Sequence, residues 1–296
     1  GLTMADHCSI GMGPVLYFGT EEQKKQWLPG AARGEYLASF WLTEPEAGSD
    51  AAATRTTAVR DGEGWVLSGS KSFITNAYYC GYIVCTAVTR PGEGHRGISA
   101  FIVPNPTPGF TIGPAYEKMG LRSSDTRPLY FDQVRLPADA LLGQEGEGFR
   151  QFMITLDGGR ISIGAMAVGI AQAALDAALA YARQRVQFGQ TISKFQAIQF
   201  KLADMAMEIE LARNMVLKAA WLKDQGRPFT REAAMAKLFA SETAVRAANQ
   251  AIQIHGGAGY MEDLPVSRFW RDAKLTEIGE GTSEIQRLVI ARHLGC

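Results

Sequence analysis

The residues best suited to chemistry form a carboxylate–glycine pair, Glu280-Gly281, directly before a segment that is typical of a helix start. Exposed backbone N–H groups at such a start can polarise a carbonyl, and a neighbouring carboxylate can remove a proton from carbon. Glu280 is therefore a candidate base. The alternative is that Glu280 only stabilises the positive end of the helix, since Ser283 and Gln286 have the spacing of a capping box.

The composition is that of an ordinary globular protein. Of 296 residues 46% are hydrophobic and 20% charged, which allows a substantial core and one to three domains. The 30 basic residues balance the 30 acidic ones, which disfavours nucleic acid or an anionic bilayer as partner. No apolar run reaches the roughly 20 residues of a membrane helix, so we expect a soluble protein. The four cysteines and four histidines lack metal-ligand spacing, which predicts reduced thiols and no structural metal.

Three regions with different patterns follow one another along the chain. Residues 1–38 are helical in composition, with Thr20 as the predicted N-cap of a helix. Residues 39–150 contain short β-prone runs separated by turns, which predict a small antiparallel barrel or sandwich. These runs are Thr54–Arg60, Trp65–Gly69, Tyr82–Val88, Ile98–Val103, Phe110–Ile112 and Leu129–Val134. Residues 151–296 have helical periodicity, so we expect three domains with these boundaries.

The C-terminal region is predicted to be a four-helix bundle. One apolar face carries Ile161, Val168, Leu175 and Leu179, and the next carries Phe195, Ile198, Leu202, Met205 and Ile209. Breaks at Gly189, 226–228 and 256–259 indicate three long helices and a short one after Thr282. The glycine-rich stretches do not lie between a strand and a helix, so a Rossmann-type nucleotide site is not expected.

Five ordered motifs carry a resemblance that covers nearly the whole chain. They are Leu42-Thr-Glu-Pro-Glu-Ala-Gly-Ser-Asp50, Lys71-Ser-Phe-Ile-Thr-Asn76, Arg183-Gln-Arg-Val-Gln-Phe-Gly189, Gln253-Ile-His-Gly-Gly257 and Ile278-Gly-Glu-Gly-Thr-Ser-Glu-Ile-Gln286. In this order they resemble the acyl-CoA dehydrogenases, most of all the short-chain, butyryl-CoA type. The resemblance implies an α+β fold with a partial N-terminal helical region, a central β-barrel domain and a C-terminal bundle. It also implies that the family's first helices are missing upstream.

The resemblance implies a FAD enzyme that converts an acyl-CoA thioester to its trans-2-enoyl-CoA. Glu280 matches the family's base for the α-proton, while flavin N5 would accept the β-hydride. The Glu280 N–H and a ribityl hydroxyl would bind the thioester oxygen. Gly281, Ser49, Asp157 and Arg160 match substrate-site positions. Some relatives place the base directly before the arginine, where this chain has Gly159, and for Arg160 a helix-start ion pair with Asp157 is the alternative.

The remaining matches concern the cofactor. Flavin-contacting positions are matched by Phe40, Leu42, Thr43, Gly48, Ser49, Phe73, Ile74 and Thr75, with Phe73 where most relatives have Trp. Thr282 and Glu284 match positions that complete the FAD site. Positions that reach the pyrophosphate and adenosine half of FAD from a neighbouring subunit are matched by Arg185, Phe188, Gln196, Gln253, Gly256 and Gly257. A guanidinium suits a pyrophosphate because it donates two hydrogen bonds. The resemblance thus implies a homotetramer, a dimer of dimers with shared FAD sites.

Three readings of function stay open at this point. The first is a dehydrogenase of fatty-acid or branched-chain amino-acid breakdown that passes electrons to an electron-transferring flavoprotein, in the bacterial cytoplasm or the mitochondrial matrix. The second is an oxidase that gives electrons to oxygen. The third is a catalytically silent helical scaffold, against which Glu280 and the aromatic Phe73 argue. Acyl length is also open, and Gly279, where several relatives carry Tyr, would widen the pocket.

Overall fold

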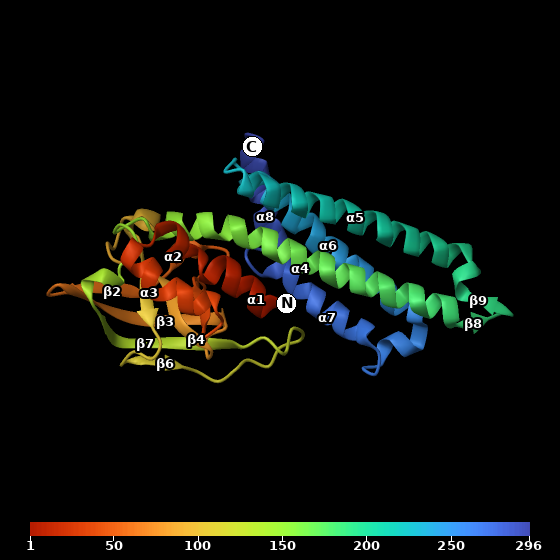
Figure 1. Ribbon diagram of the computed structural model, residues 1–296, viewed down its shortest axis with the longest axis horizontal. Coiled ribbons are helices and arrows are strands. Elements are labelled where there is room, and N and C mark those ends of the chain that lie inside the picture. The colour runs from red at the N-terminus through yellow and green to blue at the C-terminus, as the bar shows by residue number, and fades with distance from the viewer. The chain divides into compact units, whose positions relative to one another are not determined.

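The computed structural model describes all 296 residues, and the chain divides into two compact units (Figure 1). The β unit comprises Gly1–Glu117 and Arg122–Gly159, and the helical unit comprises Lys118–Leu121 and Arg160–Cys296. The helical segment 1–38 therefore clusters with the strands rather than by itself.

The β unit begins with short helices that cover its sheet. They are α1 (Leu2–Asp6), a π-helical turn (His7–Gly11), α2 (Gly13–Phe18) and α3 (Glu21–Ala32). Thr20 caps α3 as predicted: its hydroxyl accepts from the Gln23 N–H at 3.2 Å, and the Gln23 side chain accepts from the Thr20 N–H at 3.0 Å. The Gln23 amide also donates to the carbonyl oxygen of Asp139 at 2.8 Å. One polar side chain thus fixes both the helix start and a distant loop.

A seven-stranded mixed sheet forms the rest of this unit. Its order is β1-β4-β2-β3-β7-β6, with β5 on the other edge of β4. The strands are β1 (Leu37–Trp41), β2 (Thr57–Asp61), β3 (Gly64–Thr75), β4 (Cys80–Val88), β5 (Ile98–Pro104), β6 (Phe110–Ile112) and β7 (Thr126–Leu136). All six predicted β-prone runs overlap strands. The expectation of a wholly antiparallel sheet is wrong for β1, which runs parallel to β4. The β2–β3 hairpin lies between them in sequence and provides the long connection that parallel strands need.

Both faces of this sheet are buried along β4 and β5. One face packs large side chains such as Trp41, Trp65 and Phe101, and the other packs Val15 and Ala31 of the helices against Tyr82. Strands covered on both sides read as continuous apolar runs, which is why their positions were predictable.

Five helices build the C-terminal part of the chain. They are α4 (Gly148–Gln184, in the helical unit from Arg160), α5 (Gln196–Asp224), α6 (Thr230–His255), α7 (Pro265–Ile278) and α8 (Ser283–His293). Met205 and Ile209 are buried, as predicted. On α4 and α6, however, alanines occupy most of the buried stripe: Ala167, Ala171, Ala174, Ala178, Ala182, Ala233, Ala236, Ala240, Ala244, Ala247, Ala248 and Ala251. Helix α7 was not predicted as a separate helix, because the glycine-rich break before it obscured its start at Pro265.

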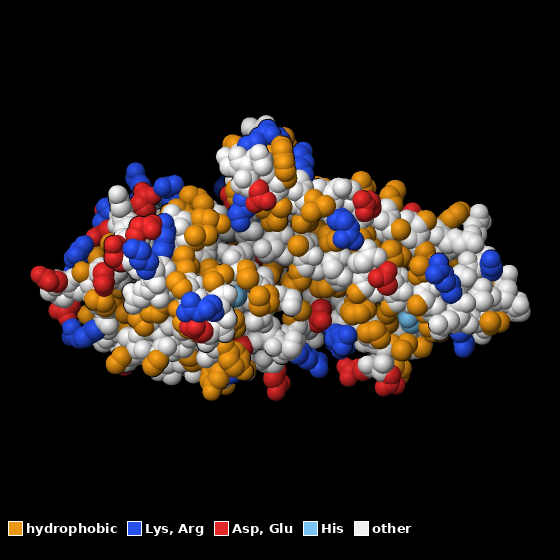
Figure 2. Space-filling model, in the orientation of Figure 1, with side chains coloured by type: hydrophobic (Ala, Val, Ile, Leu, Met, Phe, Trp, Pro, Cys, Tyr) orange, Lys and Arg blue, Asp and Glu red, His pale blue; other side chains and the backbone are white.

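Helix α4 also bears on the membrane question. It is long and apolar enough to meet the length and composition criterion for a membrane span, with a mean hydropathy of 1.6 over an 18-residue window. This window average differs from the uninterrupted apolar run sought in the sequence, because Asp157, Arg160 and Asp176 interrupt the apolar residues of α4. Core helices meet the same criterion, and 44% of that window is buried in the fold. Over the face seen in Figure 2, basic and acidic side chains are interspersed.

Candidate active site

Glu280 lies in the turn between α7 and α8, with an unusual backbone. Glu280 and Gly281 both adopt the left-handed conformation, with φ of +54° and +94°. For a residue with a Cβ this conformation costs free energy and is kept where surrounding contacts enforce it. The Thr282 hydroxyl accepts from the Ile285 N–H at 3.4 Å and so caps α8. The expected capping role of Ser283 is wrong, because Thr282 already occupies that position.

Two fully buried side chains donate hydrogen bonds to the turn. The Gln286 amide donates to the carbonyl oxygen of Glu280 at 3.3 Å and to that of Gly281 at 2.8 Å. The Lys237 ammonium, from α6, donates to the Gly281 carbonyl oxygen at 2.7 Å. The peptide groups on both sides of Gly281 are thereby fixed, and with them the backbone of Glu280.

A group of charges surrounds this turn inside the helical unit. Burial lowers the pKa of Lys237 to about 8; the Glu280 carboxylate opposes this shift, and the Arg160 guanidinium adds to it. Arg160 is only 5% exposed. Two of the predicted residues, Glu280 and Arg160, thus belong to one electrostatic group, and sequence reasoning missed its third member, Lys237.

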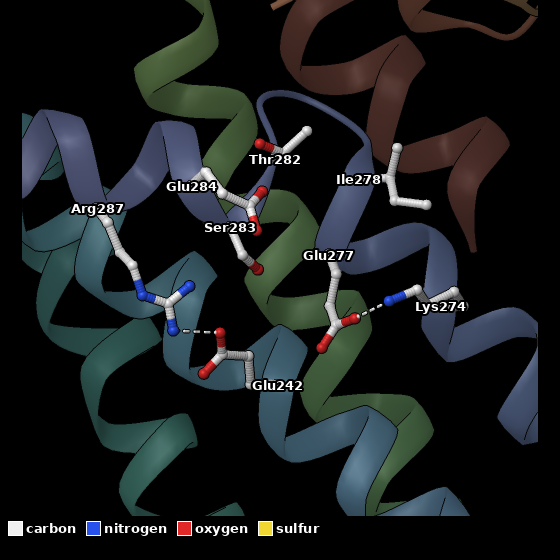
Figure 3. Close-up of a pocket in the computed structure, with 8 residues that line it drawn as sticks. All are labelled: Glu242, Lys274, Glu277, Ile278, Thr282, Ser283, Glu284 and Arg287. Carbon is white, nitrogen blue, oxygen red and sulfur yellow. Dashed lines mark hydrogen bonds and ion pairs between the residues drawn. The ribbon is translucent and has the colours of Figure 1, made fainter.

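A pocket of about 270 Å³ opens beside the start of α8 (Figure 3). Two predicted cofactor residues, Thr282 and Glu284, line it. Its other walls are Ser283, Ile278 and two ion pairs that the sequence analysis did not single out: Arg287 with Glu242, and Lys274 with Glu277, each at 2.6 Å. The sequence did not mark these four residues as part of a site, because ion pairs of this kind occur on the surfaces of many helices.

In the β unit, the loop from Phe40 to Ser49 contains predicted flavin-contacting residues and is called the flavin loop below. A buried ion pair holds it in place. The Lys71 ammonium donates to Glu44 Oε1 at 2.7 Å and to the Leu42 carbonyl oxygen at 3.3 Å, and it also contacts two threonine hydroxyls, those of Thr54 and Thr86. Lys71 is 0% and Glu44 5% exposed. The Thr43 carbonyl accepts from the Ser72 N–H at 2.9 Å. The loop is thus tied to β3 at three consecutive residues.

Burial and pairing act in opposite directions on these charges. Burial raises the pKa of Glu44, but the Lys71 ammonium and hydrogen bonds from Lys71, Thr54 and Thr56 outweigh it, so that the pKa falls to about 2. Burial lowers the pKa of Lys71, and Glu44 opposes this. Beyond the pair the loop turns tightly between Glu44 and Ala47 and leaves Gly48 and Ser49 exposed.

The aromatic segment Phe73–Thr75 lies two residues after Lys71, at an irregularity in the pairing of β3 with β7. Phe73 has a φ of +58°, and its side chain is 66% exposed, with the Tyr116 ring 5.2 Å away. Ile74 is buried and Thr75 half-buried. A strained backbone that presents an aromatic face to solvent is suited to stacking on a flat ring system. Phe40 is different, because it is half-buried and its ring stacks on the buried Phe152 at 4.1 Å.

The second set of predicted cofactor residues lies elsewhere. Arg185 precedes the hairpin of β8 (Val186–Gln187) and β9 (Gln190–Thr191), and Phe188, at its tip, is 95% exposed with a φ of +52°. Gln196 begins α5. Gln253, Gly256 and Gly257 lie exposed at the end of α6, where His255 stacks on Tyr181 of α4 at 4.3 Å. His255 also contacts the Ala251 carbonyl oxygen at 2.7 Å, so its ring has a polar partner within α6.

The two sets of predicted site residues in the helical unit lie near opposite ends of helix α6. Lys237, beside Glu280, and His255, beside the hairpin end, are 18 residues apart on one helix, or about 27 Å at 1.5 Å per residue. Thr282, Glu284, Arg160 and Glu280 therefore gather at one end of the helical unit. Arg185, Phe188, Gln196, Gln253 and the glycines gather at the other.

The residues present suit a dinucleotide with an aromatic ring. The chain offers an exposed aromatic face at Phe73, and at Gly48, Gly256 and Gly257 no atom lies within 4 Å of where a Cβ would stand. Exposed Arg185 offers a guanidinium for a pyrophosphate. Three kinds of contact that such a ligand needs are thus available on the chain.

Comparison with known proteins identifies the class. The acyl-CoA dehydrogenase N-terminal, middle and C-terminal domain families match residues 1–35, 39–134 and 146–295. The chain belongs to the acyl-CoA dehydrogenase family, oxidoreductases that act on CH–CH groups with FAD as cofactor. The fold, enzyme class and cofactor predicted from the motifs are confirmed by this membership.

Individual relatives narrow the comparison. A probable acyl-CoA dehydrogenase, YngJ, of Bacillus subtilis is 64% identical over 99% of this chain and 78% of its own length. The bovine mitochondrial short-chain specific acyl-CoA dehydrogenase is 53% identical over 99% of this chain and 71% of its own.

Solved structures agree. Butyryl-CoA dehydrogenase from Megasphaera elsdenii superimposes with a TM-score of 0.98 at 48% identity, covering 100% of this chain and 77% of that one. A chain from a study of the electron transferring flavoprotein of Acidaminococcus fermentans also gives 0.98 at 48% identity, with 99% and 77% coverage.

Proposed function

We propose that this protein oxidises a short acyl-CoA thioester to its trans-2-enoyl-CoA, with Glu280 as the base that removes the α-proton. The observation that supports this best is the turn itself. Glu280 has a strained, left-handed backbone whose carbonyl groups on both sides of Gly281 are held by Lys237 and Gln286, and backbone of this kind is kept where function requires it.

The chain's own residues have separate tasks in this proposal. Glu280 takes the α-proton, and its backbone N–H donates to the thioester oxygen, which stabilises the charge that develops there. Gly281, Ser49, Asp157 and Arg160 are assigned to acyl-CoA. When bound, FAD supplies the acceptor for the β-hydride. Gly159 leaves no second base at the alternative family position.

We assign the flavin half of FAD to the exposed Phe73, to Ile74 and Thr75, and to the loop from Phe40 to Ser49. Thr282 and Glu284 complete the FAD site. The ion pair below that loop supports its part, since it fixes the backbone that the cofactor would contact. Phe40 contributes through its backbone, because its half-buried ring stacks on Phe152.

We assign the adenosine half of FAD to residues of a second copy of the chain: Arg185, Phe188, Gln196, Gln253, Gly256 and Gly257. His255, at the end of α6 where these residues lie, is about 27 Å from Lys237 along the helix. This separation supports a shared site, because one helical unit does not bring both sets together. A nearly fully exposed Phe188 on a strained turn also favours a covering partner. We therefore propose a homotetramer built as a dimer of dimers.

The same relatives support a proposal for the electron acceptor and the setting. We propose an electron-transferring flavoprotein as acceptor, in fatty-acid or branched-chain amino-acid breakdown. The compartment would be the cytoplasm in a bacterium and the mitochondrial matrix in a eukaryote.

Anaerobic addition of butyryl-CoA to the FAD-loaded protein tests the central claim. The oxidised flavin absorbance should bleach in the unaltered protein and in Glu210→Gln, an exposed residue on α5. Glu280→Gln should retain FAD and bind butyryl-CoA without bleaching. Normal bleaching in Glu280→Gln would remove Glu280 from the role of base.

A further inference from the structure

We propose that Lys237 is a positioning residue for this reaction: its ammonium fixes the Gly281 carbonyl and so holds the Glu280 carboxylate in place for proton transfer. The inference rests on the proposed role of Glu280. Its starting point is the 2.7 Å hydrogen bond from the fully buried Lys237 side chain to the Gly281 carbonyl oxygen.

Burying a lysine at position 237 costs free energy, so its presence there needs an explanation. The neighbours of Lys237 on the buried face of α6 are small: Ala233, Ala236, Ala240 and Ser241 are all 0% exposed. Burying an ammonium costs desolvation free energy that an apolar side chain of similar length would not. Its hydrogen bond goes to the Gly281 backbone carbonyl, so the ammonium acts directly on the turn.

Lys237 and Gln286 connect the turn to different helices. Gln286 belongs to α8 and ties the turn to the helix that follows it. Lys237 ties the turn to α6, and one helical turn further along the Ser241 hydroxyl donates to the Thr276 carbonyl oxygen of α7 at 2.8 Å. Helix α6 therefore holds the chain on both sides of Glu280, five residues apart.

Charge also links Lys237 to the base. The charged groups that influence it are Glu280, Arg160, Glu277 and Glu284. Since burial lowers the pKa of Lys237 to about 8, its charge is lost within an accessible pH range. The rate of flavin reduction should then fall as pH rises through about 8, because a neutral amine holds the carbonyl less firmly than an ammonium.

The test compares Lys237→Met with Lys218→Met, an exposed lysine on α5, in the FAD-loaded protein. We expect the anaerobic flavin-reduction rate with butyryl-CoA to fall about 100-fold in Lys237→Met, as for a misplaced catalytic group. The half-saturating butyryl-CoA concentration should change by less than about threefold, and the fall above pH 8 should disappear. A Lys237→Met rate within about twofold of the unaltered protein, or a pH profile parallel to its profile, overturns the proposal.

A second variant decides the matter if Lys237→Met folds poorly. Lys237→Ala leaves space for the deleted atoms, which correspond to n-propylamine, so adding n-propylamine should restore flavin reduction while equal sodium chloride should not. Absence of recovery overturns the proposal. Glu280→Gln, measured in parallel, separates the two claims: if it is inactive while Lys237→Met is normal, Glu280 stands and Lys237 fails. If Glu280→Gln is active, the proposed function itself fails.

Discussion

The buried pair Lys71–Glu44 gives a sharp prediction about stability. Glu44→Gln keeps the shape of the side chain but leaves the Lys71 ammonium buried without its counter-charge. The pKa of Glu44 lies at about 2 instead of its ordinary 4.5, and at about 1.4 kcal/mol per pH unit this corresponds to about 3 kcal/mol of folding free energy. Loss of one partner of a buried pair has a cost of the same size, about 3–5 kcal/mol.

The sign of the pH dependence follows from the direction of the shift. A carboxyl whose pKa is lower in the folded chain stabilises it fully above the unfolded value of 4.5, and loses that contribution as pH falls toward 2. The difference in unfolding free energy between the unaltered protein and Glu44→Gln should thus be about 3 kcal/mol at pH 7 and fall to about 1 kcal/mol at pH 3.

Urea unfolding at pH 7, 5, 4 and 3 measures this difference. Glu46→Gln is the matched control, since Glu46 lies in the same loop and pairs with Arg55 at the surface, where we expect less than about 1 kcal/mol. The double variant Glu44→Gln/Lys71→Met should recover most of the loss, because both charges are gone. A single Glu44→Gln variant within about 1 kcal/mol of the unaltered protein at pH 7 would refute the reasoning.

Other positions give further predictions. Ala178→Leu should cost about 1–3 kcal/mol in urea unfolding through overpacking, while Ala180→Leu, exposed on the same helix, should be neutral; equal effects would contradict the alanine packing. Phe73→Gly should leave the free energy of unfolding unchanged or raise it by up to about 1 kcal/mol, because glycine adopts the left-handed conformation without strain. The variant should nevertheless release FAD more readily, and retention of FAD would contradict the stacking role. Phe188→Asn suits the hairpin turn better, so the free chain should fold normally but sediment as a smaller oligomer; an unchanged oligomer would argue against Phe188 as a contact.

The strands and main helices could be predicted because their signals are local. The run Phe110–Ile112 matched β6 at both ends, and the Thr20 capping box matched its helix. The parallel partner of β1 could not be predicted, because pairing between strands far apart in sequence leaves no local pattern. Helix α7 was missed for the opposite reason, since a local break hid its start.

The candidate site also has features that could be predicted from the sequence and features that could not. The motifs located Glu280, Phe73 and the flavin loop and included Lys71, but they did not predict that Lys71 or Lys237 is buried. A lysine in a helix or strand reads as exposed. Lys237 nevertheless stands four residues after Ala233 and four before Ser241, in a stripe of small residues, and that register was a usable signal. Lys71 had none, because the irregular pairing of β3 changes which side chains face inward.

The separation of the two residue sets along α6 has a genetic consequence. If each complete site takes Glu280 from one chain and Arg185 from another, two chains that are inactive for different reasons can repair each other. A mixed oligomer of a Glu280 variant and an Arg185 variant would contain some sites with both defects and some with neither. Two defective alleles would then give a partly active enzyme, whereas two alleles altered at the same end of α6 would not.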